Sequence, residues 1–217
     1  MRGKLDIVDF GLSEYAVIHS RQQELLAARQ ADKANDSLML GEHSPVYTMG
    51  RRADPANLLQ PPGSAGSPSA IPVVNIERGG DVTYHGPGQL VGYPIMRLDM
   101  TSEGPAWFVT QLEMIICKLL ENYGLHPARD PKHRGVWIGN DKIAAIGIRI
   151  SRSVSWHGFS LNVNPDLIPY RGIIPCGIRE RGVTSMAGLG IDVPMQEIKS
   201  GIIQIFIKHF GFSGNEQ

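Results

Sequence analysis

Cys176 is the residue of this sequence whose surroundings best suit a nucleophile. It stands between Pro175 and Gly177 in a stretch with neither helical nor strand periodicity, so its thiol could face a cavity. Gly177 adds a backbone N–H that can come close to a reacting group. The other cysteine, Cys117, falls inside a helical pattern, and we interpret it as a small, partly buried thiol. A cysteine in a loop can also be purely structural, so the residues alone leave both roles of Cys176 open.

A reactive cysteine acts as its thiolate, and a neighbouring group must lower its pKa. The sequence offers a histidine, such as His85, or the lysine Lys142. A lysine ammonium about 4 Å from a thiolate stabilises it by roughly 4 kcal/mol at an effective dielectric constant of about 20. This energy corresponds to at most about three pKa units. Chain position does not show which group meets the thiol: Lys142 could equally be a solvated residue after a turn, and His85 a hydrogen-bonded structural histidine.

The stretch 78–95, RGGDVTYHGPGQLVGYPI, is the second candidate for chemistry. Gly79 and Gly80 can adopt positive φ and approach another group closely, which would leave their N–H groups free to face a ligand. The residues from Tyr84 to Gln89 predict a polar turn that leads into an alternating strand. A hairpin turn at the edge of a sheet would have the same pattern, so both interpretations stand.

Strand and helix patterns surround these residues. Strands are predicted at 4–10, 38–40, 46–49, 71–76, 90–98, 136–138, 142–150 and 156–163, and helices after a Ser13 N-cap, at 105–123 and at 195–210. Ala145 and Gly147 share one strand face, and so do Gly158 and Ser160, which leaves room there for a ligand or another segment. The pattern predicts an α+β fold with a mixed, mostly antiparallel sheet and helices packed on one side of it.

Composition restricts the class of protein. The 217 residues are most simply one domain, 1–217, with a mobile surface loop at 53–70. Lysine plus arginine equal aspartate plus glutamate at 21 each, and no apolar run could span a bilayer, so we expect neither nucleic acid nor membrane as a partner. The N-terminus lacks a secretory signal, and two cysteines do not make a disulfide framework, which favours the cytoplasm. The seven histidines show no metal-ligand spacing, so the sequence predicts no metal.

Four segments, in order, resemble the signature of the lipoyl(octanoyl) transferases of lipoate biosynthesis. They are 43–51 (HSPVYTMGR), 78–95, 142–147 (KIAAIG) and 175–178 (PCGI), and together they span most of the chain. The resemblance implies the biotin/lipoate protein ligase-like fold. It also implies transfer of an octanoyl group from octanoyl-acyl carrier protein to a lysine of lipoyl domains, which is the first step of endogenous protein lipoylation.

The resemblance also assigns residues to the reaction. It implies a catalytic dyad of Cys176 and Lys142, in which Cys176 carries the acyl group as a thioester. The substrate-binding residues that it implies are Arg78, Gly79, Gly80, Asp81, Val82, Thr83, Tyr84, His85, Ala145, Ile146, Gly147, Gly158, Phe159 and Ser160. As a hypothesis, backbone N–H groups near Gly177 and in the Gly79-Gly80 turn stabilise the oxyanion.

No cofactor is expected, because the acyl group arrives on the phosphopantetheine of acyl carrier protein and thioester exchange needs no ATP. The acceptors implied by the resemblance are apo lipoyl domains of 2-oxoacid dehydrogenase complexes and the glycine cleavage H protein, served by a monomer. Three alternatives remain: an ATP-dependent lipoate or biotin protein ligase on the same fold, a non-catalytic acyl-binding module, and a cysteine hydrolase. A ligase would not need Cys176, a binding module would need neither Cys176 nor Lys142, and a hydrolase would release free octanoate.

Overall fold

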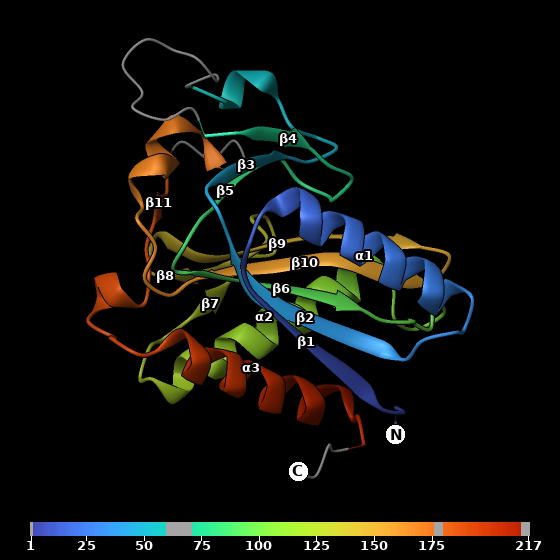
Figure 1. The fold of residues 1–217 in the computed structure, drawn as a ribbon. Coiled ribbons are helices and arrows are strands. Elements are labelled where there is room, and N and C mark those ends of the chain that lie inside the picture. Colours follow the sequence, from blue (N-terminus) through green and yellow to red (C-terminus); the bar gives the residue numbers. More distant parts are fainter. Residues whose placement is uncertain (1, 60–70, 176–179, 214–217) are drawn as a thin grey trace.

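The computed structural model describes residues 2–59, 71–175 and 180–213, and its centre is an eight-stranded mixed sheet (Figure 1). The strands lie in the order β1-β2-β6-β10-β9-β8-β7, and β11 pairs with β9. Their bounds are β1 Leu5–Ser13, β2 Asp36–His43, β6 Gln89–Ile95, β7 Ala128–Arg129, β8 Val136–Ile138, β9 Asp141–Ser151, β10 Val154–Asn162 and β11 Gly182–Val183. Among these strands the β1–β2 and β9–β11 pairs are parallel and the other pairs antiparallel, which confirms the predicted sheet type.

A second, three-stranded sheet has the order β4-β3-β5. Its strands are β3 Val46–Met49, β4 Val73–Asn75 and β5 Val82–His85. Strand β3 has the predicted bounds, whereas the second half of β5, Tyr84 and His85, was assigned to a polar turn. The four residues of β5 are too short a run, next to glycines and a proline, to show a strand period. They form a strand because the antiparallel partner β3 supplies their hydrogen bonds, from Val46 opposite His85 to Met49 opposite Val82.

Helices cover both faces of the large sheet, so the prediction of helices on one side is wrong (Figure 1). Helix α1, Tyr15–Gln30, packs on one face, and α2, Pro105–Asn122, and α3, Met195–Phe210, pack on the other. The central strands β6 and β10 are buried at every position. Strands with both faces buried need a covering layer on each side.

The C-terminus of α3 agrees with the sequence prediction, whereas the N-terminus of α1 does not. Helix α3 has its predicted bounds, and Gly211 at its C-cap has φ +67°, a conformation that glycine adopts without strain. Ser13 does not cap α1, because strand β1 extends through Ser13 and its hydroxyl donates to the Phe10 carbonyl at 2.9 Å. Glu14 takes the N-cap position instead, without a side-chain cap.

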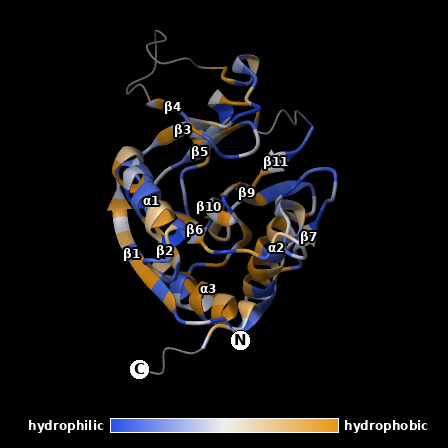
Figure 2. Cartoon of the chain, turned by 90° about the vertical axis from the view of Figure 1, so that its right-hand side faces the viewer, coloured by the Kyte–Doolittle hydropathy of each residue, from blue (hydrophilic) through white to orange (hydrophobic). Residues whose placement is uncertain are grey.

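Helices α2 and α3 pack large apolar side chains against the strands in the larger core. Phe108, Leu112, Ile115 and Leu119 of α2 are fully buried, as the helical stripe predicts, and α3 adds Phe206 and two isoleucines. Figure 2 shows hydrophobic and hydrophilic residues alternating along both helices. Burying one such large apolar side chain contributes roughly 1.5–3 kcal/mol, so this layer rigidly supports the sheet beneath it. In the described part of the chain, no helix combines the length and apolarity needed to cross a membrane.

The two-residue period of β9 and β10 positions the site. In β9, Ala144 and Ile146 pack into the core on the α2 side, and in β10 Phe159 and Leu161 do the same. The intervening small residues, Ala145, Gly147, Gly158 and Ser160, therefore face the layer that contains α1 and the second sheet. This confirms the face assignment made from the sequence.

Candidate active site

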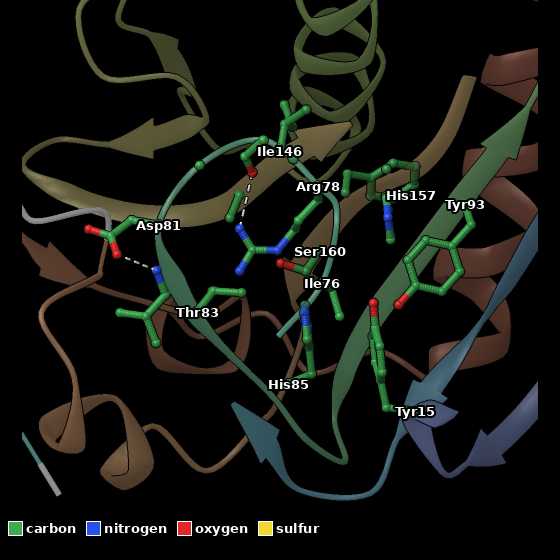
Figure 3. Close-up of a pocket in the computed structure, with 17 residues that line it drawn as sticks. Tyr15, Ile76, Arg78, Asp81, Thr83, His85, Tyr93, Ile146, His157 and Ser160 are labelled. Atoms are coloured by element: carbon green, nitrogen blue, oxygen red, sulfur yellow. Dashed lines mark hydrogen bonds between the residues drawn. The ribbon is translucent and has the colours of Figure 1, made fainter. Parts of the chain in front are cut away.

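A narrow cavity lies between the two sheets, on the face of the large sheet that α1 covers (Figure 3). Every predicted substrate-binding residue except Tyr84 lines it: Arg78, Gly79, Gly80, Asp81, Val82, Thr83, His85, Ala145, Ile146, Gly147, Gly158, Phe159 and Ser160. Tyr84 packs instead in an apolar cluster with Tyr47 and Ile173. The strand period explains the exception, because Thr83 and His85 point to the cavity and Tyr84 between them points away.

Four further residues line the cavity that the sequence analysis missed: Tyr15, Ile76, Tyr93 and His157. Tyr15 comes from the start of α1 and Tyr93 from β6, so their meeting depends on how the helix packs on the sheet. The available signal was the period of β6, since Tyr93 shares a face with Val91 and with the α1-side core. Nothing in the sequence around Ile76 or His157 distinguishes them from ordinary strand residues.

Gly147 lets the segment 78–80 lie directly on β9. A Cβ atom at Gly147 would be 2.9 Å from the Gly79 carbonyl oxygen and 2.9 Å from Cδ of Arg78. The Gly79 N–H donates to the Ile148 carbonyl at 3.0 Å, which fixes the segment on the strand. The expectation that the Gly79 N–H is free for a ligand is therefore wrong. The backbone N–H of Gly80, which has φ +94°, stays the candidate oxyanion donor on this turn.

Arg78 fixes the other side of the same turn. Its guanidinium donates to the Thr48 carbonyl at 2.6 Å, to the Thr48 hydroxyl at 2.9 Å and to the Gly79 carbonyl at 3.1 Å. The Asp81 carboxylate accepts hydrogen bonds from the backbone N–H groups of Val82 and Asp54, at 2.7 and 3.1 Å, and Figure 3 shows the bond from Val82. Arg78 and Asp81 thus hold the cavity wall in place by bonds within the protein.

The histidines in the inner part of the cavity, near Tyr15 and Tyr93, are uncharged, although the Arg78 guanidinium lies near them. Burial, together with the positive charge of Arg78 and the neighbouring histidines, lowers the pKa of His85 and of His157 to about 3. Burial likewise lowers the pKa of His43, which hydrogen-bonds the Tyr93 hydroxyl at 2.7 Å, to about 4. His85 Nδ1 lies 2.7 Å from Oε1 of Gln89, which matches the structural alternative for this histidine. Imidazoles with such pKa values are neutral at pH 7.

Lys142 lies at the opposite end of the cavity. It is the second residue of β9 and only 7 % exposed, so its interpretation as a solvated residue is wrong. It lines a small recess with Thr83, Ala145 and Ser160, which also line the main cavity, and with Pro175. Pro175 is the described residue to which Cys176 is bonded. Cys176, Gly177 and residues 60–70 of the predicted loop lie outside the described residues, so the distance between Cys176 and Lys142 stays untested.

The Trp137 ring holds two cations in place near this recess. The Lys142 ammonium lies 4.7 Å from the ring centroid and the Arg181 guanidinium 4.5 Å. Strand β11, which follows Arg181, pairs with Asp141 and Lys142. The chain is therefore anchored beside Lys142 both before and after the residues 176–179.

A wider, positively charged groove leads from the surface to Lys142. Arg52, Lys132 and Arg134 line it together with Gly80 and Ile148. Arg52, Lys132 and Arg134 are exposed, and Arg134 also lies 3.3 Å from the carboxylate of the buried Glu113. An anionic group that enters this groove would meet Arg52 and Lys132 first and the Lys142 ammonium deeper in the groove.

Cys117 has the structural role expected from its position. It lies in α2, partly buried against the larger core. Burial raises the pKa of its thiol to about 11, so it is protonated at neutral pH. A protonated thiol is a poor nucleophile, which leaves Cys176 as the candidate.

Sequence comparison finds a matching protein family and similar proteins from other organisms. The family described as the lipoyl protein ligase A/B catalytic domain matches residues 14–207. An octanoyltransferase of Alkaliphilus metalliredigens is 42 % identical over 212 residues, which cover 96 % of each chain. An octanoyltransferase of Gloeobacter violaceus is 40 % identical and covers 96 % of this chain and 91 % of its own.

Solved structures confirm the predicted fold. A putative lipoate protein ligase from T. acidophilum with bound lipoic acid has a TM-score of 0.73 at 14 % identity, covering 98 % of this chain and 87 % of its own. A biotin protein ligase from Aquifex aeolicus has a TM-score of 0.53 at 12 % identity, covering 96 % and 69 %. At sequence identities this low, the similarity shows a shared fold alone.

Proposed function

Because this chain belongs to the lipoyl protein ligase A/B family, and within it to the octanoyltransferases, we propose how its cavity carries out octanoyl transfer. The acyl chain lies in the cavity between the two sheets, with its carbonyl at the end where Lys142 and Pro175 meet. Cys176 and Lys142 form the catalytic pair. The observation that carries this assignment is the buried Lys142 at the end of a cavity that the predicted substrate residues line.

In the first half-reaction the Cys176 thiolate attacks the thioester carbonyl of octanoyl-acyl carrier protein. A bond forms between the acyl carbon and Sγ of Cys176, and the bond to the phosphopantetheine sulfur breaks. The leaving thiolate takes a proton from the Lys142 ammonium, which becomes a neutral amine. The products are an octanoyl thioester on Cys176 and the free thiol of the carrier.

In the second half-reaction the neutral amine of the acceptor lysine attacks the thioester on Cys176. Lys142, now neutral, takes a proton from this amine as the amide bond forms. The bond between the acyl carbon and Cys176 breaks, which regenerates the thiolate and the ammonium. Thioester exchange is nearly balanced and amide formation runs downhill, so the reaction uses no ATP and no cofactor takes part in it.

The donor enters through the positively charged groove. The phosphopantetheine arm carries a phosphodiester, and guanidinium and ammonium groups bind phosphate oxygens through charge-assisted hydrogen bonds. Arg52 and Lys132 of the groove supply such groups on the route to Lys142. The acceptors are lipoyl domains, including those of 2-oxoacid dehydrogenase complexes and the H protein, and the enzyme acts as a monomer in the cytoplasm.

Intact-protein mass spectrometry tests the proposal. After mixing with octanoyl-acyl carrier protein, the wild type and Cys117→Ser should each gain one octanoyl unit, and Cys176→Ser should gain none. Adding an apo lipoyl domain should then move the unit from the enzyme to that domain without ATP. ATP-dependent transfer of free octanoate would support the ligase, release of octanoate without an acceptor would support the hydrolase, and no transfer would support the binding module.

A further inference from the structure

Three possible metal ligands meet beside the inner part of the cavity, from three separate elements. His19 comes from α1, Glu77 from the segment between β4 and β5, and His157 from β10. One ligand atom of each lies within 4.8 Å of the other two. The Glu77 carboxylate oxygen is 3.0 Å from Nε2 of His19 and 3.8 Å from Nε2 of His157.

Burying the His157 side chain in this position is energetically unfavourable. Its side chain is 1 % exposed, yet neither ring nitrogen has a hydrogen-bond partner among the described residues. Its backbone has φ +53°, a left-handed conformation that is strained for a residue with a side chain. Buried polar groups normally have partners, so two unused nitrogen atoms need an explanation.

The protein holds the His157 ring in place by other means. The ring stacks on Trp156, with 4.1 Å between centroids, and the backbone N–H of His157 donates to Oε1 of the buried Gln22 at 3.1 Å. The His19 ring also stacks on the His157 ring, with 5.8 Å between centroids. The two imidazoles and the carboxylate are therefore already gathered, so binding a small ion would require little rearrangement.

The distances suit a small divalent cation. Two ligand atoms at about 2.1 Å from a tetrahedral Zn²⁺ are about 3.4 Å apart. The observed 3.0 and 3.8 Å lie on either side of this value, and all three ligand atoms lie within 4.8 Å of one another. Imidazole nitrogen suits Zn²⁺ and other borderline cations, whereas Mg²⁺ and Ca²⁺ prefer all-oxygen sites.

Electrostatics limit the affinity of this cluster. Arg78 and Arg149 both act on His157, and their positive charges oppose a cation. Glu77 offsets part of this charge, and the Arg78 guanidinium is already bonded to Thr48. The Glu77 side chain is 38 % exposed, so water screens the repulsion and an ion can enter from that side.

From the geometry and the unpartnered buried imidazole, we propose that His19, Glu77 and His157 bind a borderline divalent cation such as Zn²⁺. Three protein ligands leave a fourth position for water. His157 is the member of the set that also lines the acyl cavity, so the ion would fix that part of the wall (Figure 3). The ion takes no part in the acyl transfer, because Lys142 lines a separate recess at the other end of the cavity.

The test measures zinc on full-length, tag-free protein that has been stripped with a chelator, reloaded with ZnCl₂ and freed of excess by gel filtration. Elemental analysis should find one zinc per chain in the wild type. Glu77→Gln and His19→Ala should each weaken zinc binding by at least about tenfold, because even loss of an outer-shell contact typically costs this much. His126→Gln, which removes an exposed imidazole, is the matched control and should keep the ion.

A second arm separates this site from the thiols. Zinc retained by Cys176→Ser and lost by Glu77→Gln supports the His19–Glu77–His157 site, and cobalt(II) in the same preparation should give the visible absorption of a four-coordinate ion. Circular dichroism checks that each variant is folded. Less than stoichiometric zinc in the wild type, zinc kept by a folded Glu77→Gln, or zinc lost in Cys176→Ser would each overturn the proposal.

Discussion

The two ends of the cavity differ in their electrostatic environment. Around Lys142 the walls carry cations that solvent can reach through the groove, and the Lys142 ammonium rests against an aromatic ring. At the inner end, burial keeps His85 and His157 neutral and raises the pKa of Tyr15 and Tyr93. The difference separates two tasks: one end can move protons and meet an anionic donor, and the other can only shape a wall.

The strongest test of this difference removes the positive charge at the Lys142 end of the cavity. Lys142→Met keeps an unbranched side chain against Trp137 but can carry no proton. We expect octanoyl transfer to fall by about 10³-fold, within the range for loss of a general acid–base group. Single-turnover assays with octanoyl-acyl carrier protein and an apo lipoyl domain measure this, with Lys33→Ala, an exposed lysine after α1, as control. Transfer within tenfold of the wild type would remove Lys142 from the mechanism.

The next prediction concerns the wall that joins the two ends. In Gly147→Val, the new side chain would collide with the Gly79 carbonyl and Arg78 and displace the segment 78–80. A displacement of about 1 Å near a reacting group can cost about 10²-fold in rate. We expect kcat to fall by about this factor. Gly139→Ala is a control at a turn where a Cβ meets open space, although its φ of +58° costs some stability. Unchanged kcat in a folded Gly147→Val would show that the segment tolerates the shift.

The neutral end should make the protein acid-sensitive. Burial lowers the pKa of His43 to about 4 and of His85 and His157 to about 3, against about 6.5 in the unfolded chain. Between these values the unfolded state binds more protons, so the stability is complete above about pH 6.5 and is lost as the pH falls. The three groups should together lower the free energy of unfolding by about 3.7 kcal/mol between pH 7 and pH 5.5.

Urea unfolding at a series of pH values measures this loss, with metal chelated throughout. His85→Gln removes one of the three titrating groups and should reduce the pH dependence by about a third. A stability curve that stays flat from pH 7 to pH 5.5 would mean that these imidazoles do not remain neutral in the folded protein.

The smallest expected effect is at Arg52 and Lys132, in the outer part of the positively charged groove. Exposed ion pairs contribute about 0.2–1 kcal/mol each. We therefore expect Arg52→Ala and Lys132→Ala each to raise KM for octanoyl-acyl carrier protein about two- to fivefold with little change in kcat. The effect should shrink as salt is added, because exposed charges are screened. An increase in KM that is equal at low and high salt would argue against electrostatic capture of the donor.

Sequence patterns predicted one wall of the cavity better than the other. Ala145, Gly147, Gly158 and Ser160 were assigned to one face because a strand alternates strictly, and the structure places them there. Tyr84 does not line the cavity because the alternation of β5 points it away, and β5 was not recognised as a strand from the sequence. The helices on both faces were missed because alternating patterns do not reveal that β6 and β10 are buried throughout.

The rest of the site depends on contacts that no local pattern contains. Tyr15, Tyr93 and His157 meet only when α1 has packed on the sheet. The same holds for His19, Glu77 and His157, whose separation along the chain hid any ligand spacing. The environment of Lys142 was also invisible, because its burial arises from Trp137 and from the pairing of β11 with β9. The roles of Cys176 and Lys142 stay predictions.

The Trp137 ring gives this protein a built-in optical reporter. Its π face lies close to two positive charges, Lys142 and Arg181, and the proposed reaction changes one of them. When Lys142 gives up its proton, the local electric field on the indole should change, and its emission wavelength with it. With Trp107 and Trp156 replaced by phenylalanine, stopped-flow fluorescence should follow both half-reactions in real time, without any label on the donor or the acceptor.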